Sequence, residues 1–230
     1  VATTVLAGLT CLLLIPFLPA EKVAKLSAIP WAKLCLLYSG VRVEVHGRHH
    51  LLPGQSYVIV ANHLSQFDIF VLYGYLGVDF RWVMKHELRK IPVIGICCEK
   101  LGHVFINRDN TEAAIASLNE ARARLANGAS VLFFPEGTRS HDGQLKPFKK
   151  GAFKMAQDLH IPVLPVTLSG TFDILPAGTL RLHPGATARL ILHPPLTVTG
   201  HSDTELQTLV RQSRAAIATP LSDSCPQPSL

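Results

Sequence analysis

The chain has 230 residues, of which 48% are hydrophobic and 17% are charged, and its formal net charge at pH 7 is +6. This length suits one domain with an attached segment and is long enough to bury a full core. The apolar composition is unusual for a freely soluble enzyme, and the positive charge favours anionic partners such as lipid headgroups or phosphorylated substrates. Nucleic acid is not expected as a partner, because only 7% of residues are aromatic and no basic stripe is interleaved with them.

The cysteines and histidines suggest neither a disulfide framework nor a metal site. No two of the five cysteines have C-x-x-C spacing, and four of the five lie in apolar surroundings, as small buried residues do in a reducing compartment. No group of His, Cys, Asp or Glu has the spacing of metal ligands, although eleven histidines are present. We therefore expect no metal ion.

The first 40 residues are expected to form an apolar helical segment that associates with a membrane. Residues 1–20 carry no charge and are rich in leucine, but glycine and proline interrupt them. A helix over residues 1–15 would be about 22 Å long, short of the roughly 30 Å hydrocarbon core, so a full span is not assigned. Residues 21–40 fit either a helix lying on a bilayer surface or an amphipathic helix packed on the domain. A signal peptide is less favoured, because no basic stretch precedes the apolar run.

Residues 41–219 are expected to form one catalytic domain, followed by a flexible tail over residues 220–230. Strand patterns alternate with helical patterns, which predicts an α/β fold with a mostly parallel central sheet flanked by helices. Residues 131–134 form a continuous apolar run, typical of a strand buried on both faces. The other predicted strands are residues 41–46, 57–60, 80–84, 104–106, 163–168 and 188–192. One helix is predicted directly after residue 68, and others over residues 91–101, where the helix is broken, 110–127 and 148–159. A last helix is predicted to begin at a capping box of Ser202 and Glu205.

Two candidate side chains flank the junction between the strand over residues 57–60 and the next helix. Ser65 and Asp68 have the spacing of a capping box, with Asp in the place of the usual Glu or Gln. His63 lies just before the helix, where the positive end of the dipole helps to keep the imidazole neutral and able to act as a base. A nearby carboxylate would then fix the tautomer of the ring and offset the charge gained with a proton. Taken alone, these residues favour capping over catalysis.

A second candidate is the turn at residues 134–139, Phe-Pro-Glu-Gly-Thr-Arg, which leaves the buried strand over residues 131–134. Backbone N–H groups can converge in such a turn, and Arg139 can present a bidentate donor, which suits a phosphate group. The alternative is a plain turn in which Arg139 pairs with a surface acid. A basic cluster follows the turn and is interpreted as a face for anionic lipid or an acyl carrier; it comprises Lys146, Lys149, Lys150 and Lys154.

Four segments, in the same order, resemble the motifs of the glycerolipid acyltransferases, the lysophosphatidic acid acyltransferase family. The first is Asn62-His63-x-Ser65-x-x-Asp68. The others are residues 102–108 (Gly-His-Val-Phe-Ile-Asn-Arg), 134–140 (Phe-Pro-Glu-Gly-Thr-Arg-Ser) and 161–166 (Ile-Pro-Val-Leu-Pro-Val). The resemblance covers residues 41–195, most of the chain, and it reverses the preference for the structural interpretations of His63 and Arg139.

This resemblance implies the glycerolipid acyltransferase fold and a direct acyl transfer, with His63 as the base and Asp68 as its partner. The fatty acyl group of an acyl thioester would pass to the free hydroxyl of lysophosphatidic acid and give phosphatidic acid. The donor, acyl-CoA or acyl-acyl carrier protein, is a co-substrate, and no cofactor is expected. Ser65 is not expected to act as a nucleophile. The residues implied in substrate binding are Lys85, Arg108, Gly137, Thr138, Arg139 and Glu136, the last of which would orient Arg139 or a glycerol hydroxyl.

Two alternatives to this function stay open. The same chemistry could act on another acceptor, such as glycerol phosphate, another lysophospholipid or an aminolipid. A non-catalytic lipid-binding protein could share the fold, but the presence of His63, Asp68 and Arg139 argues against it. The expected location is the cytoplasmic face of a bacterial inner membrane, where an anionic lipid surface would be the third partner, beside acceptor and donor.

Overall fold

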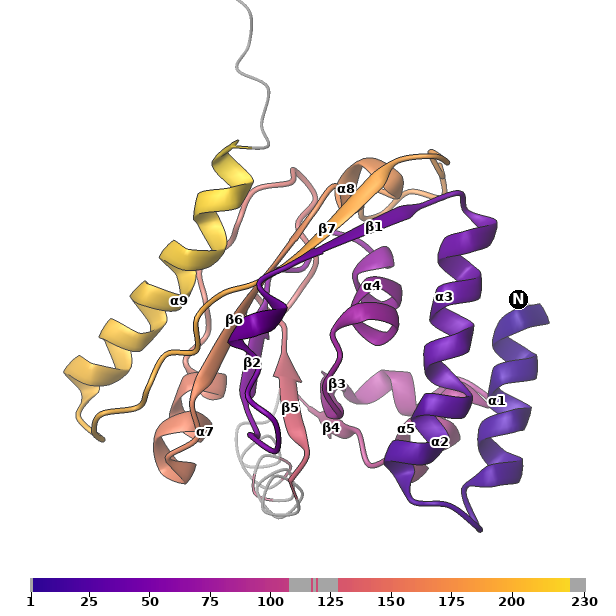
Figure 1. Ribbon diagram of the computed structural model, residues 1–230, viewed down its shortest axis with the longest axis horizontal. Coiled ribbons are helices and arrows are strands. Elements are labelled where there is room, and N and C mark those ends of the chain that lie inside the picture. Colours follow the sequence, from indigo (N-terminus) through magenta and orange to yellow (C-terminus); the bar gives the residue numbers. More distant parts are fainter. Residues whose placement is uncertain (1, 108–116, 118, 120–127, 224–230) are drawn as a thin grey trace, which may run out of the picture.

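The central element of the fold is a seven-stranded sheet, counted over the residues that the structure describes (Figure 1). This computed structural model describes residues 2–107, 117, 119 and 128–223. The strands are β1 (Arg42–His46), β2 (Val58–Ala61), β3 (Phe80–Lys85), β4 (Val104–Ile106), β5 (Ser130–Phe133), β6 (Val163–Ser169) and β7 (Thr187–Leu192). They run across the sheet in the order β1-β7-β6-β2-β5-β3-β4, and all neighbouring pairs are parallel except β6 with β7.

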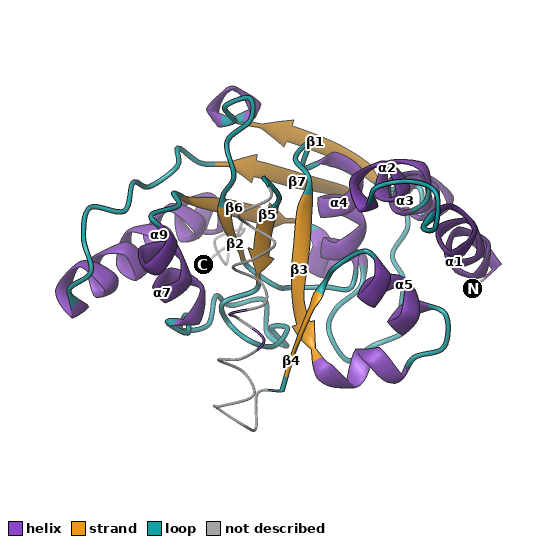
Figure 2. Cartoon of the chain, turned by 90° about the horizontal axis from the view of Figure 1, so that it is seen from below, coloured by secondary structure: helices purple, strands orange, loops and turns teal. Residues whose placement is uncertain are grey.

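Helices cover both faces of this sheet (Figures 1 and 2). One face carries α7 (Gly151–Leu159) and α9 (Asp203–Asp223), and the other carries α3 (Ala28–Tyr38) and α4 (Phe67–Tyr75). The remaining helical segments are α1 (Ala2–Leu14), α2 (Ala20–Leu26), α5 (Ile94–Lys100), α8 (Thr171–Ile174) and the 3₁₀ turns η1 (Arg48–His50) and η2 (His86–Lys90). The expected α/β fold, with a mostly parallel sheet flanked by helices, is therefore confirmed.

A hydrophobic core on each face explains why the central strands are continuously apolar. Ile59 of β2 and Leu132 of β5 belong to the core with α3 and α4. Val58 and Val131, each one residue earlier, belong to the core with α7 and α9. Successive side chains of a strand point to opposite faces, so a strand covered on both sides has no polar face. Every residue of β2, β5 and β6 is buried.

The parallel strands direct the segments that follow them to one edge of the sheet. The segments after β2, β5 and β3 hold residues 62–68, 134–140 and 86–90. The carboxyl ends of neighbouring parallel strands lie at the same edge, which is where α/β sheets bind their ligands. The topology thus brings together motifs that are far apart in the sequence.

The N-terminal segment contains α1, α2 and α3, and the continuous helix expected over residues 21–40 is wrong. Ser27 separates α2 from α3. Pro30 has no N–H to continue the hydrogen-bond ladder of α2, but proline is tolerated in the first turn of a helix such as α3. Helix α3 packs against α4 and buries Leu36 in the main core. The part of residues 21–40 that forms α3 is therefore packed on the α/β domain.

Helix α1 exposes a row of apolar side chains. It packs closely on the segment that leads into α5, because a Cβ on Gly8 would lie 2.1 Å from the Cγ1 of Val93. The large exposed apolar residues on and just after this helix are Val5, Leu6, Leu9, Leu13 and Phe17. Among the helices of the described residues, none has the length and apolar character needed to cross a membrane.

Helix α9 begins at the expected capping box but runs further than expected. The N–H of Ser202 donates to the Oε2 of Glu205 at 3.0 Å, and the N–H of Glu205 donates to the Oγ of Ser202 at 3.2 Å. The tail expected from residue 220 is wrong at its start, because Pro220 lies inside α9. Leu221, which follows the proline, packs against the core beneath this helix. Residues 224–230 lie outside the described part.

Two other helical expectations differ from the structure or fall outside it. Helix α7 begins at Gly151 and not at residue 148. The reason is that the N–H of Lys149 donates to the carbonyl of Pro135 at 2.9 Å, which holds the preceding residues against the neighbouring turn. Of the helix expected over residues 110–127, only positions 117 and 119 belong to the described residues.

Candidate active site

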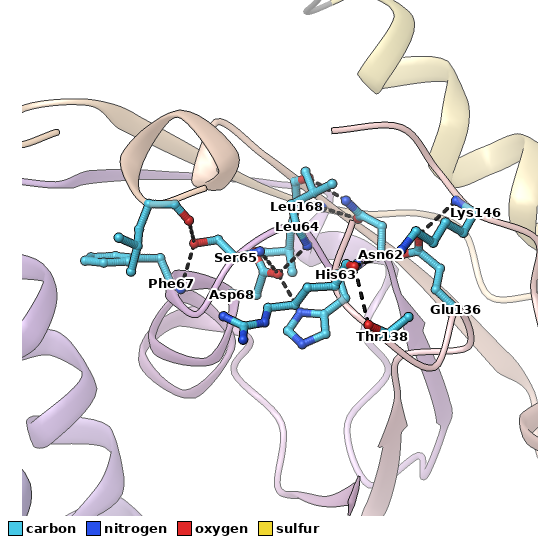
Figure 3. Close-up of polar contacts among 12 residues, drawn as sticks. Asn62, His63, Leu64, Ser65, Phe67, Asp68, Glu136, Thr138, Lys146 and Leu168 are labelled. Atoms are coloured by element: carbon cyan, nitrogen blue, oxygen red, sulfur yellow. Dashed lines mark hydrogen bonds and ion pairs between the residues drawn. The ribbon is translucent and has the colours of Figure 1, made fainter. Parts of the chain in front are cut away.

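His63 and Asp68 lie side by side where β2 leads into α4 (Figure 3). The Nδ1 of His63 is 2.8 Å from the Oδ2 of Asp68, whose side chain is 0% exposed, whereas the histidine side chain is 16% exposed. An ionised carboxylate can only accept hydrogen bonds, so Nδ1 carries the proton of the neutral ring. The lone pair of Nε2 is then available to take a proton, as a general base requires.

Asp68 also organises the backbone around the histidine. Its Oδ2 accepts the N–H groups of Leu64 and Ser65 at 2.7 and 2.9 Å. The bond to Ser65 is the carboxylate half of the expected capping box, so Asp68 supports the start of α4 and orients His63 with the same oxygen. One oxygen of Asp68 thus makes both the capping contact and the contact with His63.

The hydroxyl of Ser65 is held by hydrogen bonds to the backbone. Its Oγ accepts the N–H of Phe67 at 3.2 Å and donates to the carbonyl of Leu175 at 2.7 Å, which ties the start of α4 to the end of α8 (Figure 3). The residue directly before α4 is Gln66, so Ser65 lies one position earlier than the capping box places it. Because the Ser65 proton is donated to a carbonyl, this hydroxyl is not arranged as a nucleophile activated by His63.

The turn after β5 packs around the backbone of His63. The N–H of His63 donates to the Oε1 of Glu136 at 2.7 Å, and the carbonyl of His63 accepts the N–H of Ser140 at 2.8 Å. Both backbone polar groups of the histidine are thus bonded to one short segment. The structure brings the motif at residues 62–68 and the motif at residues 134–140 into direct contact.

Glu136 has a different role from the one expected from the sequence. It is 5% exposed, and its Oε2 accepts the N–H of Lys146 at 2.8 Å while Oε1 is occupied by His63. The expectation that it orients Arg139 or a glycerol hydroxyl is not what the structure shows, because both carboxylate oxygens bind backbone N–H groups. Burial raises the pKa of Glu136, against the lowering effect of these two N–H donors.

Arg139 is half-buried at the end of the same turn. Its carbonyl accepts the Nζ of Lys146 at 2.9 Å, whereas its guanidinium has no ion-pair partner among the described residues. Gly137 takes the positive φ of 81° that the turn needs, and Thr138 is exposed beside it. A partly desolvated guanidinium that has no carboxylate to neutralise it is suited to an anionic ligand.

The basic cluster after the turn divides into two parts. Lys146 is bonded to the turn through both its N–H and its Nζ. Lys149 also lies over the turn, since a Cβ on Gly137 would lie 3.2 Å from its Nζ. Lys154 lies on α7 and pairs with Asp158 at 3.2 Å. The sequence analysis missed the contact of Lys146 and Lys149 with the turn, because no short-range spacing signals it.

The structure gives little support for two other expected substrate-binding residues, Lys85 and Arg108. Lys85 ends β3 at the edge that holds His63, but it is exposed and pairs with Glu87 at 2.7 Å. Arg108 lies outside the described residues. Within the described part of the chain, no three side chains of His, Cys, Asp and Glu are grouped so that they could hold a metal ion.

Asn62, which the sequence analysis did not assign a role, joins two strands beneath the site. Its Nδ2 donates to the carbonyl of Leu168 and its Oδ1 accepts the N–H of Leu168, both at 2.8 Å. Asn62 is fully buried, so these two bonds satisfy polar groups that water cannot reach. The side chain therefore fixes the end of β2, from which His63 projects, against β6.

Known proteins resemble this chain in sequence. The sequence model of the family described as Acyltransferase matches residues 42–169. A chloroplastic 1-acyl-sn-glycerol-3-phosphate acyltransferase of Brassica napus is 37% identical over 167 residues, 72% of this chain. The 1-acyl-sn-glycerol-3-phosphate acyltransferase alpha of Mus musculus is 33% identical over 192 residues, 81% of this chain. This chain spans 48% of the length of the Brassica protein and 67% of the mouse protein.

A solved structure resembles the whole fold. The crystal structure of the 1-acyl-sn-glycerophosphate (LPA) acyltransferase PlsC from Thermotoga maritima has a TM-score of 0.78 and 30% sequence identity. The match covers 96% of this chain and 89% of the Thermotoga chain. The similarity therefore includes the N-terminal helices as well as the sheet.

Proposed function

Because this chain belongs to the acyltransferase family, we propose that it transfers a fatty acyl group from an acyl thioester to the free hydroxyl of lysophosphatidic acid. The product would be phosphatidic acid. The observation that carries this proposal is the His63–Asp68 pair at the carboxyl edge of the sheet, 2.8 Å apart. The names of the relatives, each of which is a 1-acylglycerol-3-phosphate acyltransferase, support the choice of acceptor.

The proposed reaction is a direct transfer in which His63 is the general base. Its Nε2 takes the proton of the acceptor hydroxyl as the oxygen attacks the thioester carbonyl, and Asp68 stabilises the imidazolium that forms. The tetrahedral intermediate then collapses, the C–S bond breaks, and the thiolate leaves and recovers the proton from His63. No acyl-enzyme is needed, which agrees with the structural environment of Ser65.

The phosphate of the acceptor is proposed to bind at the turn of residues 136–139. The supporting observation is that Arg139 is half-buried and that its guanidinium has no acidic partner among the described residues. The exposed Thr138 lies beside it, whereas the N–H of Gly137 donates to the carbonyl of Phe134 at 3.0 Å. Lys146 and Lys149 add positive charge to the same turn, so the field there favours an anion.

The protein is also proposed to work at a membrane surface, where its lipid substrates are found. The exposed leucines of α1 support this proposal, because soluble surfaces rarely expose such a row. The side proposed is the cytoplasmic face of a bacterial inner membrane. Its support is the thiol state of Cys11, Cys35, Cys97 and Cys98, all of which are free.

The function is tested by mass spectrometry of products from a panel of acceptors. Purified protein in lipid vesicles is given lysophosphatidic acid, glycerol phosphate, lysophosphatidylcholine or monoacylglycerol, with acyl-CoA or acyl-acyl carrier protein as the donor. Phosphatidic acid should form fastest, and only with His63 intact, so His63→Ala is the matched control. Faster acylation of another acceptor would correct the acceptor, and no acylation of any acceptor would exclude the activity.

A further inference from the structure

Phe134 stacks directly on the imidazole of His63. The two ring centroids are 3.8 Å apart and the ring planes are inclined by only 7°. The contact follows from the sheet, since β2 and β5 are neighbours with Val60 opposite Phe133, and both rings lie just beyond those paired residues. None of the roles described so far for the turn after β5 uses this ring.

The core holds the ring of Phe134 in place. Phe134 packs against the main hydrophobic core and contacts the ring of Trp82, with centroids 5.5 Å apart and an interplanar angle of 31°. Trp82 lies on β3 and is buried. The plane of Phe134 is therefore set by the core, and that plane in turn limits how the imidazole can tilt.

The stacking geometry favours the charged form of the histidine. Two neutral aromatic rings prefer an offset or edge-to-face arrangement, because their negative faces repel when they overlap face to face. A cation over the face of a ring is attracted to that same negative charge. A centroid distance of 3.8 Å with nearly parallel planes is thus a better contact for imidazolium than for imidazole.

The other charged groups around His63 are known from the contacts on each side. From α4, the carboxylate of Asp68 bonds to Nδ1, and from the turn after β5 the carboxylate of Glu136 bonds to the backbone N–H. The cations of that turn are the guanidinium of Arg139, the ammonium of Lys146, which bonds to the carbonyl of Arg139, and the ammonium of Lys149, which lies over Gly137. Like the two carboxylates, Phe134 favours the imidazolium form of His63. Unlike them, it covers the face of the imidazole ring.

We propose that Phe134 is a positioning residue for the general base, holding the plane of the His63 ring and stabilising the imidazolium formed when the hydroxyl proton is taken. The catalytic part of this inference rests on the proposed function. In that step the O–H bond of the acceptor breaks, the N–H bond forms at Nε2, and the positive charge develops over the face of Phe134. The residue contacts the base and need not contact either substrate.

The experiment is an NMR titration of His63 in ¹³C-histidine-labelled protein, with its signal assigned by its absence in His63→Gln. Phe134→Leu keeps an apolar side chain but removes the ring, so the pKa of His63 should fall by about half a unit to one and a half units. Phe134→Tyr keeps the ring and should retain the wild-type pKa of His63. Phe172→Leu, the same change at a partly buried ring on α8, is the matched control and should have no effect.

The pH profile of kcat/KM provides a second test, because it would not shift if Phe134 only supported the fold. In Phe134→Leu the acid limb of the kcat/KM profile should shift to lower pH, and kcat should fall about two- to thirtyfold while the KM of the acceptor is retained. Phe134→Tyr should restore both. If Phe134→Leu does not fold, as judged by circular dichroism, Phe134→Met fills the same space without a ring and is titrated in its place.

The outcomes separate this inference from the proposed function. An unchanged pKa of His63 in Phe134→Leu or Phe134→Met would overturn the inference, whatever acceptor the wild type uses. A shifted pKa in a protein whose wild type acylates no acceptor would remove the proposed function but leave the stacking effect established. The titration needs no substrate, so it does not depend on the identity of the acceptor.

Discussion

The backbone N–H of His63 donates to the carboxylate of Glu136 at 2.7 Å, across 73 positions of the chain. The other oxygen of that carboxylate accepts the N–H of Lys146. One buried side chain therefore joins the loop that holds His63, the turn proposed to bind phosphate and the segment of Lys146. This relationship predicts that Glu136 acts on catalysis through position and not through contact with a substrate.

Glu136→Gln should accordingly lower kcat with little change in the KM of the acceptor. The amide can accept from only one of the two N–H groups, because its own NH₂ faces the other. Loss of a charge-assisted bond of about 1.5–3 kcal/mol corresponds to a fall of about ten- to over a hundredfold. Steady-state kinetics check this, with Glu205→Gln, at the exposed capping box of α9, as the control. A rise in KM at constant kcat would indicate direct binding of the acceptor.

The same substitution should change how stability depends on pH. Burial raises the pKa of Glu136 above its ordinary value of 4.5, so the folded protein holds this proton more tightly than the unfolded chain does. The stabilising contribution is fully present below 4.5 and is lost as the pH rises through the folded-state pKa. The free energy of unfolding of the wild type should therefore decline relative to Glu136→Gln over that range. Urea unfolding at a series of pH values measures this, and a constant difference would contradict the prediction.

His63 and Asp68 should behave as one unit. His63→Ala and Asp68→Asn should each lower kcat about 10²- to 10⁴-fold, because the base is lost or its tautomer is no longer fixed. The double variant should be little worse than His63→Ala, since the carboxylate acts through the ring. Single-turnover rates of the three variants test this. Losses that multiply would show that Asp68 contributes independently, through the backbone bonds to Leu64 and Ser65.

Arg139→Lys should weaken the use of phosphate-bearing acceptors, although the charge is kept. An ammonium cannot reproduce the bidentate geometry of a guanidinium. Losing one charge-assisted bond of about 1.5–3 kcal/mol corresponds to a fall of about ten- to over a hundredfold in kcat/KM for lysophosphatidic acid. A monoacylglycerol of the same chain length, which lacks the phosphate, should be affected little.

The comparison of the two acceptors decides what Arg139 binds. Arg189→Lys, an exposed arginine on β7 that pairs with Glu44 at 2.9 Å, is the matched control and should change neither acceptor. Equal losses with both acceptors in Arg139→Lys would mean that Arg139 supports the fold or the donor. The proposed phosphate site would then have to move to other cations.

Membrane attachment should depend on the exposed face of α1. Replacing Leu6, Leu9 and Leu13 together by serine should lower binding to anionic vesicles at least about tenfold, because each buried leucine contributes about 1.5–3 kcal/mol. Deleting residues 1–40 is a poorer test, since it would remove Leu36 from the main core. Leu180→Ser, which is 99% exposed elsewhere, is the control. Vesicle sedimentation is the measurement, and equal sedimentation of the triple variant and the wild type would refute the role of α1.

The sequence by itself determined the features that depend on local spacing. Burial on both faces gave β2 and most of β5 continuous apolar runs, so these strands could be predicted from a few residues each. His63 and Asp68 are five positions apart on one strand-to-helix junction, and such a short separation nearly dictates that their side chains can meet. The order of the motifs then identified the family.

Only the tertiary structure decided which distant groups meet at this edge of the sheet. Glu136 carries no signal that it binds the backbone of His63, and Phe134 looks like any apolar residue that ends a buried strand. The passage of α9 through Pro220, next to Leu221 on the core, was likewise visible only in the tertiary structure. A hydrogen bond or a ring stack across 70 or so positions has no periodicity in the sequence, because its geometry arises from the parallel pairing of β2 with β5.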